Sequence, residues 1–248
     1  MSIGLSANSK TKTNKIDKFG ANFDIDTGTT PETVWAHGGV FPFIDAGIQM
    51  DVISSDANDI DGGTGAQKIF VTYYTTDNTE KTKEVTLNGT TAVELDDDVK
   101  FVSRAYVSQS GSNNTNAGEI NIVDRATGLV VYQSIEIAEG QTLSAVQICP
   151  KNKEGRVKTH SVTFAKTQAP AGSADMRFNL RKSNGTILTK HVTVISSTKS
   201  GDNVIYGSEE NDGILMESGD IAFWQCIGVS ANDTPIEGRF KVEFKSVE

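Results

Sequence analysis

The sequence predicts an all-β protein with two antiparallel β-sandwich or jelly-roll-like domains behind an extended N-terminal arm. Three observations point to this fold class. Apolar and polar residues alternate along many short segments, no window of a dozen residues keeps a helical apolar pattern, and turn-forming Gly, Asn and Ser residues separate the segments. With 248 residues, the chain is long enough for two such domains.

Residues 1–43 are predicted to form an extended arm that contacts other chains. The first 18 residues carry four lysines against one aspartate, and they have too little apolar surface to offset the cost of ordering. Glycine and proline then interrupt the stretch at intervals that oppose a long helix. The side chains expected to bind a partner are Phe19, Phe23, Ile25, Trp35, Phe41 and Phe43. The alternative is that Trp35 and the phenylalanines cover the first sandwich.

Residues 44–140 are predicted to form the first sandwich. Alternation with a period of two is clear at Ile48, Met50 and Val52, whose side chains share one face. Strands are expected at 48–54, 68–74, 83–87, 101–107, 119–123 and 129–134. The aspartates at 96–98 are interpreted as a charged turn between strands.

Residues 141–248 are predicted to form the second sandwich, with a boundary near 138–142. Strands are expected at 143–149, 157–165, 176–181, 186–194, 204–206, 221–229 and 239–244. Asn184 and Gly185 are the strongest hairpin signal, because both tolerate the positive φ angles of a type I′ turn. The expected core contains Phe178, Leu180, Phe223 or Trp224, Phe240 and Val242.

Composition argues against two classes of partner. A net charge of −9 and a pI near 4.9 repel phosphate backbones, so we expect no nucleic-acid binding. No apolar run approaches the roughly 20 residues of a membrane helix, and no secretion signal begins the sequence, so we expect no membrane partner and folding in a cytoplasm. There Cys149 and Cys226 are expected to be reduced, buried thiols.

No motif predicts a catalytic, cofactor-binding or metal site. His37, His160 and His191 lie apart in the sequence, and His160 shares the parity of apolar residues in its strand, which predicts burial. The stretch 56–62 does not have the register of a calcium loop and is interpreted as a solvated loop. Glycines near 62–65 lack the Gly-Lys-Ser/Thr of a phosphate-binding loop. We therefore expect a protein that is not an enzyme.

One stretch resembles a known protein family. Residues 18–35 are KFGANFDIDTGTTPETVW, and Gly38-Gly39 follow shortly after. This stretch is similar to an F-G-x-N-x-D-I-D-T-G-T-x-P-E-x-V-W segment that precedes the β domains in a family of tailed-bacteriophage virion proteins. Further similarity lies at 54–59, 63–66, 85–91, 104–107 and 115–120. The triplet Cys149-Pro150-Lys151 departs from the family pattern.

The resemblance implies a structural component of the virion, assembled in the host cytoplasm, with no catalytic residues. We expect a capsid decoration or cement protein that binds the major capsid protein or other virion proteins as a homo-oligomer, with a trimer favoured. The alternative is a neck, tail or fibre module that binds a host-surface glycan through Trp35 or the loop at 109–118. A glycan-cleaving enzyme is disfavoured, because the sequence has no evident acid pair and no solenoid repeat.

Overall fold

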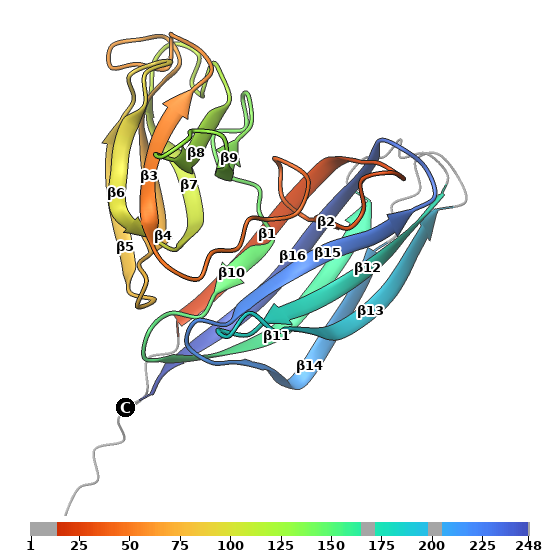
Figure 1. Cartoon of the computed structure of the whole chain (residues 1–248). Helices are drawn as coiled ribbons and strands as arrows, with labels where there is room; N and C mark the ends of the chain where they lie inside the picture. Colours follow the sequence, from red (N-terminus) through yellow and green to blue (C-terminus); the bar gives the residue numbers. More distant parts are fainter. Residues whose placement is uncertain (1–13, 165–171, 198–204, 248) are drawn as a thin grey trace, which may run out of the picture.

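The computed structural model describes residues 14–164, 172–197 and 205–247, and these residues are all-β, as the sequence predicts (Figure 1). Their strands form four antiparallel sheets, which pack as two sandwiches. Within these ranges, no helix has the length and apolarity that crossing a membrane requires.

The larger sandwich is a jelly roll built from both ends of the chain. One sheet has the strand order β1-β16-β11-β14, and the other has the order β10-β15-β12-β13, with the short β2 paired to β15. Apart from the hairpin of β12 and β13, consecutive strands of this sandwich cross between the two sheets in the manner of two Greek keys. The bounds are β1 (Asn14–Ile25), β2 (Glu32–Thr33), β10 (Val146–Ile148), β11 (Lys153–Phe164), β12 (Gly172–Arg181), β13 (Ile187–Ser197), β14 (Ile205–Met216), β15 (Ile221–Val229) and β16 (Thr234–Ser246).

The smaller sandwich is inserted between β2 and β10. Its sheets have the orders β6-β3-β8-β9 and β5-β4-β7. The bounds are β3 (Ile48–Ser54), β4 (Ala66–Tyr74), β5 (Glu80–Thr86), β6 (Val93–Val99), β7 (Phe101–Ser110), β8 (Ile120–Asp124) and β9 (Val131–Ile135). The chain enters and leaves this sandwich at one place, because the Ala36 amide donates to the Leu143 carbonyl at 2.9 Å and the Ala145 amide donates to the Val34 carbonyl at 2.9 Å.

The predicted arm is wrong for the described part of residues 1–43, because residues 14–25 are a strand of the jelly roll. β1 pairs with β16 from Asn14, opposite Phe244, to Ile25, opposite Thr234. The sequence pattern did not predict this strand, because its inward positions include Lys18, which interrupts the apolar alternation. Residues 1–13 of the predicted arm lie outside the described residues.

The jelly-roll core follows the alternation of its strands. On β16, Phe240, Val242 and Phe244 are buried, and the charged residues between them point outward. The predicted core residues Phe178, Leu180, Trp224, Phe240 and Val242 all belong to this core. Phe223 belongs to a different cluster, since its neighbour Trp224 takes the inward position on β15.

An aromatic seam joins the two sandwiches. The seam consists of Trp35 and Phe41 from the entry segment, Tyr74 and Phe101 from the inserted sandwich, and Val146, Ile148, Ile221 and Phe223 from β10 and β15. The Trp35 and Phe41 rings meet edge to face with centroids 5.0 Å apart. Burial of such side chains contributes roughly 1.5–3 kcal/mol each, so the seam holds the inserted sandwich against the outer face of one jelly-roll sheet.

Two local predictions are corrected. The aspartates at 96–98 were predicted as a turn, but they lie within strand β6. There Asp97 accepts a hydrogen bond from Arg125 at 2.8 Å, and Asp96 accepts one from the Tyr73 hydroxyl at 2.5 Å. The Asn184-Gly185 hairpin is confirmed between β12 and β13, but of these two residues only Gly185 has a positive φ. The turn is therefore not the predicted type I′, which needs positive φ at both central residues.

The loop 56–62 is also more than a solvated loop. The Asp59 carboxylate is fully buried and accepts four hydrogen bonds: from the Ser54 hydroxyl at 2.6 Å and from the amides of Ala66, Ala117 and Gly118 at 2.7–2.9 Å. A buried carboxylate with this many donors ties neighbouring loops together. The sequence showed the acidic residues but not the amides that converge on one of them.

Burial of the other predicted buried groups is confirmed. His160 is 1% exposed and stacks on Phe178 with ring centroids 4.7 Å apart. Cys149 and Cys226 are buried free thiols. Burial raises the pKa of Cys149 to about 12 and that of Cys226 to about 11, so both thiols are protonated and unreactive near neutral pH.

We predict that Gly20→Ala destabilises the protein by about 1–3 kcal/mol, the usual cost of overpacking. A Cβ atom at Gly20 would lie 2.1 Å from the backbone nitrogen of Ala145, so β1 and the returning chain would have to separate. Gly28→Ala is the matched control in the same segment, because nothing lies within 4 Å of its Cβ position. Urea unfolding of both variants checks this, and equal stabilities would contradict it.

Candidate interaction surface

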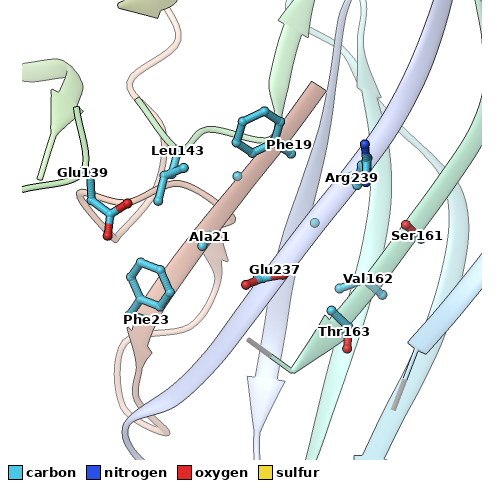
Figure 2. Close-up of a pocket in the computed structure, with 12 residues that line it drawn as sticks. Phe19, Ala21, Phe23, Glu139, Leu143, Ser161, Val162, Thr163, Glu237 and Arg239 are labelled. Atoms are coloured by element: carbon cyan, nitrogen blue, oxygen red, sulfur yellow. The ribbon is translucent and has the colours of Figure 1, made fainter. Parts of the chain in front are cut away.

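A groove runs beside β1 on the outer face of the jelly roll (Figure 2). Its cavity volume is about 590 Å³. Strand pairing builds its floor, because Phe19 of β1 lies opposite Arg239 of β16, which lies opposite Ser161 of β11. The segment that returns from the inserted sandwich forms the other wall with Glu139 and Leu143.

The groove lining combines apolar and charged side chains. Phe19, Phe23 and Leu143 provide the apolar surface, while the carboxylates of Glu139 and Glu237 provide the negative charge. Partial desolvation raises the pKa of Glu237, although the residue is exposed. Such a groove suits an apolar segment of a partner with a cationic side chain nearby.

The one guanidinium in the groove lining already has a partner. Arg239 donates two hydrogen bonds to Asp17, from Nε at 2.8 Å and from Nη2 at 2.7 Å. This two-point contact lowers the pKa of Asp17. Arg239 therefore contributes little positive charge toward a bound partner.

The structure divides the six residues predicted to bind a partner. Phe19 is 41% exposed and Phe23 is half-buried, and both line the groove. Ile25 is buried in the jelly-roll core, and Trp35 and Phe41 are buried in the aromatic seam. Phe43 packs on Phe223 in the seam, with ring centroids 5.0 Å apart. The prediction for Ile25, Trp35 and Phe41 is therefore wrong, since their own chain covers them.

Sequence reasoning missed the other residues that line the groove. Glu237 and Arg239 reach Phe19 only because the last strand pairs with the first, and Glu139 and Leu143 reach it only because the chain returns from the insertion. The alternation around Phe240 and Val242 does indicate that Glu237 and Arg239 point outward. It does not indicate which strand lies beside them.

A second cavity, of about 340 Å³, lies where β1 meets the inserted sandwich. Its most unusual group is Lys18, which is 7% exposed and whose amine donates to the backbone carbonyl of Ser103 across the junction. Nearby, the Ser103 hydroxyl donates to Gln147 at 2.8 Å and the Tyr74 hydroxyl donates to Glu80 at 2.6 Å. Burial, assisted by repulsion from Arg104, lowers the pKa of Lys18 to about 7.

A cluster of three carboxylates lies at the far end of β1. Oxygen atoms of Asp24, Asp26 and Asp233 all lie within 4.8 Å of one another. A hydrogen bond that the protonated Asp24 carboxyl donates to Asp233, together with burial and nearby negative charges, raises the pKa of Asp24. The cluster could hold a cation such as Ca²⁺, although water would have to complete the six to eight oxygen ligands that Ca²⁺ takes.

Comparison with known proteins assigns no family. No protein-family model matches the sequence, and no curated protein matches it. The chain is similar to solved structures from infectious bursal disease virus. For the Gx strain the identity is 7% and the TM-score is 0.24, with 98% of this chain and 74% of that chain covered. For the T13 viral particle the identity is 8% and the TM-score is 0.24, with 96% and 71% covered. For the VP2 subviral particle the identity is 9% and the TM-score is 0.22, with 97% of this chain and 78% of that chain covered. TM-scores this low do not establish a common fold.

We predict that Lys18→Met stabilises the protein below pH 7 by about 1–4 kcal/mol, the range seen when buried charges are replaced by apolar groups. The pKa of Lys18 falls from 10.5 to about 7 on folding, so the unfolded chain binds more protons between these pH values. The cost of Lys18 is complete below pH 7 and fades as the pH rises toward 10.5. Urea unfolding from pH 6 to pH 10 should show a shrinking gain.

Lys15→Met is the control for this experiment, since the Lys15 side chain is 73% exposed. It should give no gain at any pH. A gain for Lys18→Met that does not change with pH would contradict the assignment.

We predict that Asp233→Asn raises the melting temperature at pH 7 but not at pH 3. The pKa of Asp24 is raised in the folded state, so its contribution to stability is present at low pH and is lost as the pH rises through that raised value. Removing the neighbouring carboxylate relieves this loss, and Asn tolerates the φ of 53° at position 233. Asp61→Asn, in an exposed loop, has the same effect on net charge and should leave the melting temperature unchanged.

Proposed function

We propose that this chain is a structural protein of a tailed-bacteriophage virion. The observation that carries the proposal is the jelly-roll strand order, β1-β16-β11-β14 facing β10-β15-β12-β13, with a second sandwich inserted. Jelly rolls are the common architecture of viral capsid domains, although lectins and cupins share them. The resemblance of residues 18–35 to phage virion proteins favours the virion role among these possibilities.

The residues that carry the resemblance have structural roles here. The Glu32 carboxylate is buried and accepts from the Asn22 amide at 2.8 Å and from the Gly39 backbone amide at 2.8 Å. The Trp35 indole donates to the Gly39 carbonyl at 3.1 Å. The segment therefore fastens β1 to the entrance of the inserted sandwich. This role is consistent with a resemblance that concerns architecture and not catalysis.

Within the virion, we propose a capsid decoration protein that binds the major capsid protein. The groove beside β1 is the candidate contact, because it combines exposed Phe19 with the carboxylates of Glu139 and Glu237. A partner segment with an apolar residue next to a lysine or arginine would complement it. Self-association of the decoration protein would place several such grooves on one particle and strengthen binding through multivalency.

A neck, tail or fibre position is the alternative, with a host glycan as ligand. Stacking of a sugar on Trp35 is ruled out in this conformation, because Trp35 is 2% exposed and lies in the aromatic seam. The loop within 109–118, where residues 112–114 are exposed, remains the candidate for that contact.

We predict that the protein is present in hundreds of copies on purified particles. Decoration covers the repeating subunits of the shell, whereas a neck or fibre module occurs about a dozen times or fewer. Quantitative staining against the major capsid band distinguishes the two positions, and complete absence from particles would contradict a virion role.

Phe19→Ser should reduce rebinding of the purified protein to stripped particles, while Leu129→Ser, at an 83% exposed position of the inserted sandwich, should not.

A further inference from the structure

The outermost strand of one jelly-roll sheet carries an unusual amount of exposed apolar surface. β13 lies at the end of the order β10-β15-β12-β13, and in the described part of the chain its one strand partner is β12. Val192 and Val194 are each 60% exposed, and Ile187 is 51% exposed. Edge strands are normally protected from pairing by charges, prolines or covering loops. β13 has no proline, and Lys190 is its one lysine or carboxylate side chain, so this protection is weak.

Two opposite charges stand directly beside the exposed valines. On β12, Arg177 lies opposite Val192 and Asp175 lies opposite Val194. Both charged side chains are exposed, and neither forms an ion pair within the described ranges. Directly opposed residues of an antiparallel pair share one face of the sheet. The outer face at this edge thus has two neighbouring rows, one basic and one acidic, each ending in a valine.

We propose that β13 pairs antiparallel with β13 of a second copy, about a two-fold axis at Thr193. This register sets Val192 of each copy opposite Val194 of the other and gathers four valines into one patch. Each row across the new sheet then runs from Arg177 through the two valines to Asp175 of the second copy. The charges at the ends of every row are opposite, so the surface is complementary to itself.

Neighbouring registers are less favourable. A shift by two residues in one direction sets Val194 opposite Lys190, and a shift in the other direction sets Val192 opposite Ser196. Either shift breaks the four-valine patch. Lys190 is also the extra residue of the bulge in the β12–β13 pairing, so regular strand geometry extends from His191 onward. An isologous contact of this kind closes as a dimer and does not extend into a fibre.

This inference does not depend on the proposed virion function, because it is tested on the isolated protein. Sedimentation equilibrium over a concentration series should show a monomer–dimer equilibrium. Val194→Lys puts like charges near the axis and should raise the dissociation constant more than about tenfold. Leu129→Lys, at an exposed position of the inserted sandwich, is the matched control and should not change it. Circular dichroism confirms that each variant is folded.

A charge reversal tests the rows. Asp175→Arg alone places arginines at both ends of each row and should weaken the dimer, whereas Asp175→Arg with Arg177→Asp restores opposite ends and should recover it. Thr193→Cys tests the axis, since directly opposed Cα atoms lie about 4.5–5.5 Å apart, within disulfide range. Oxidation should link Thr193→Cys into dimers, and Leu129→Cys should stay monomeric on a non-reducing gel.

Three results would overturn the proposal. The first is a protein that stays monomeric at every concentration up to the solubility limit. The second is an oligomer that is insensitive to Val194→Lys, or one whose stoichiometry is three, as a trimer would give. The third is a dimer in which Thr193→Cys fails to cross-link, because that result removes the proposed register and its axis.

Discussion

The pairing of β1 with β16 is the constraint on which the rest of the structure depends. The first described strand and the last lie side by side over their length, so the jelly roll closes only when both ends of the chain are present. This long-range contact must form against the loop-closure entropy of the whole intervening chain. It also supplies the floor of the groove, since Phe19 meets Arg239 only through that register. Architecture and candidate contact surface therefore share one cause.

The insertion of the smaller sandwich is compatible with this closure because its two connections are adjacent. The backbone around Trp35 lies beside that of Ser144, so the inserted unit joins the jelly roll at one point. The aromatic seam then fixes it against the sheet that contains β15. Lys18 is the costly group of this junction, since its desolvated amine donates to the Ser103 carbonyl at a position where an apolar side chain would carry no charge to bury.

The two surfaces with exposed apolar side chains have different physical characters. The groove beside β1 presents phenylalanine rings next to carboxylates, a combination that favours a basic partner. The edge at β13 presents valines next to one basic and one acidic row, a combination that favours an identical partner. They belong to different sheets of the jelly roll, so binding to a shell and association between copies can be altered by separate substitutions.

Local patterns in the sequence determined the fold class and most strands after residue 44, together with the hairpin at Gly185 and the core residues from Phe178 to Val242. These features could be predicted because alternation and turn chemistry depend only on neighbouring residues. They could not indicate that 14–25 is a strand, since its inward face carries Lys18 and receives its apolar cover from distant segments. The same limit applied to the candidate site. The sequence predicts Phe19, Phe23 and Trp35 alike as partner contacts, yet Phe19 is exposed, Phe23 is half-buried and Trp35 is buried. Only tertiary structure decided between them, because burial depends on which strands and domains come together across the chain.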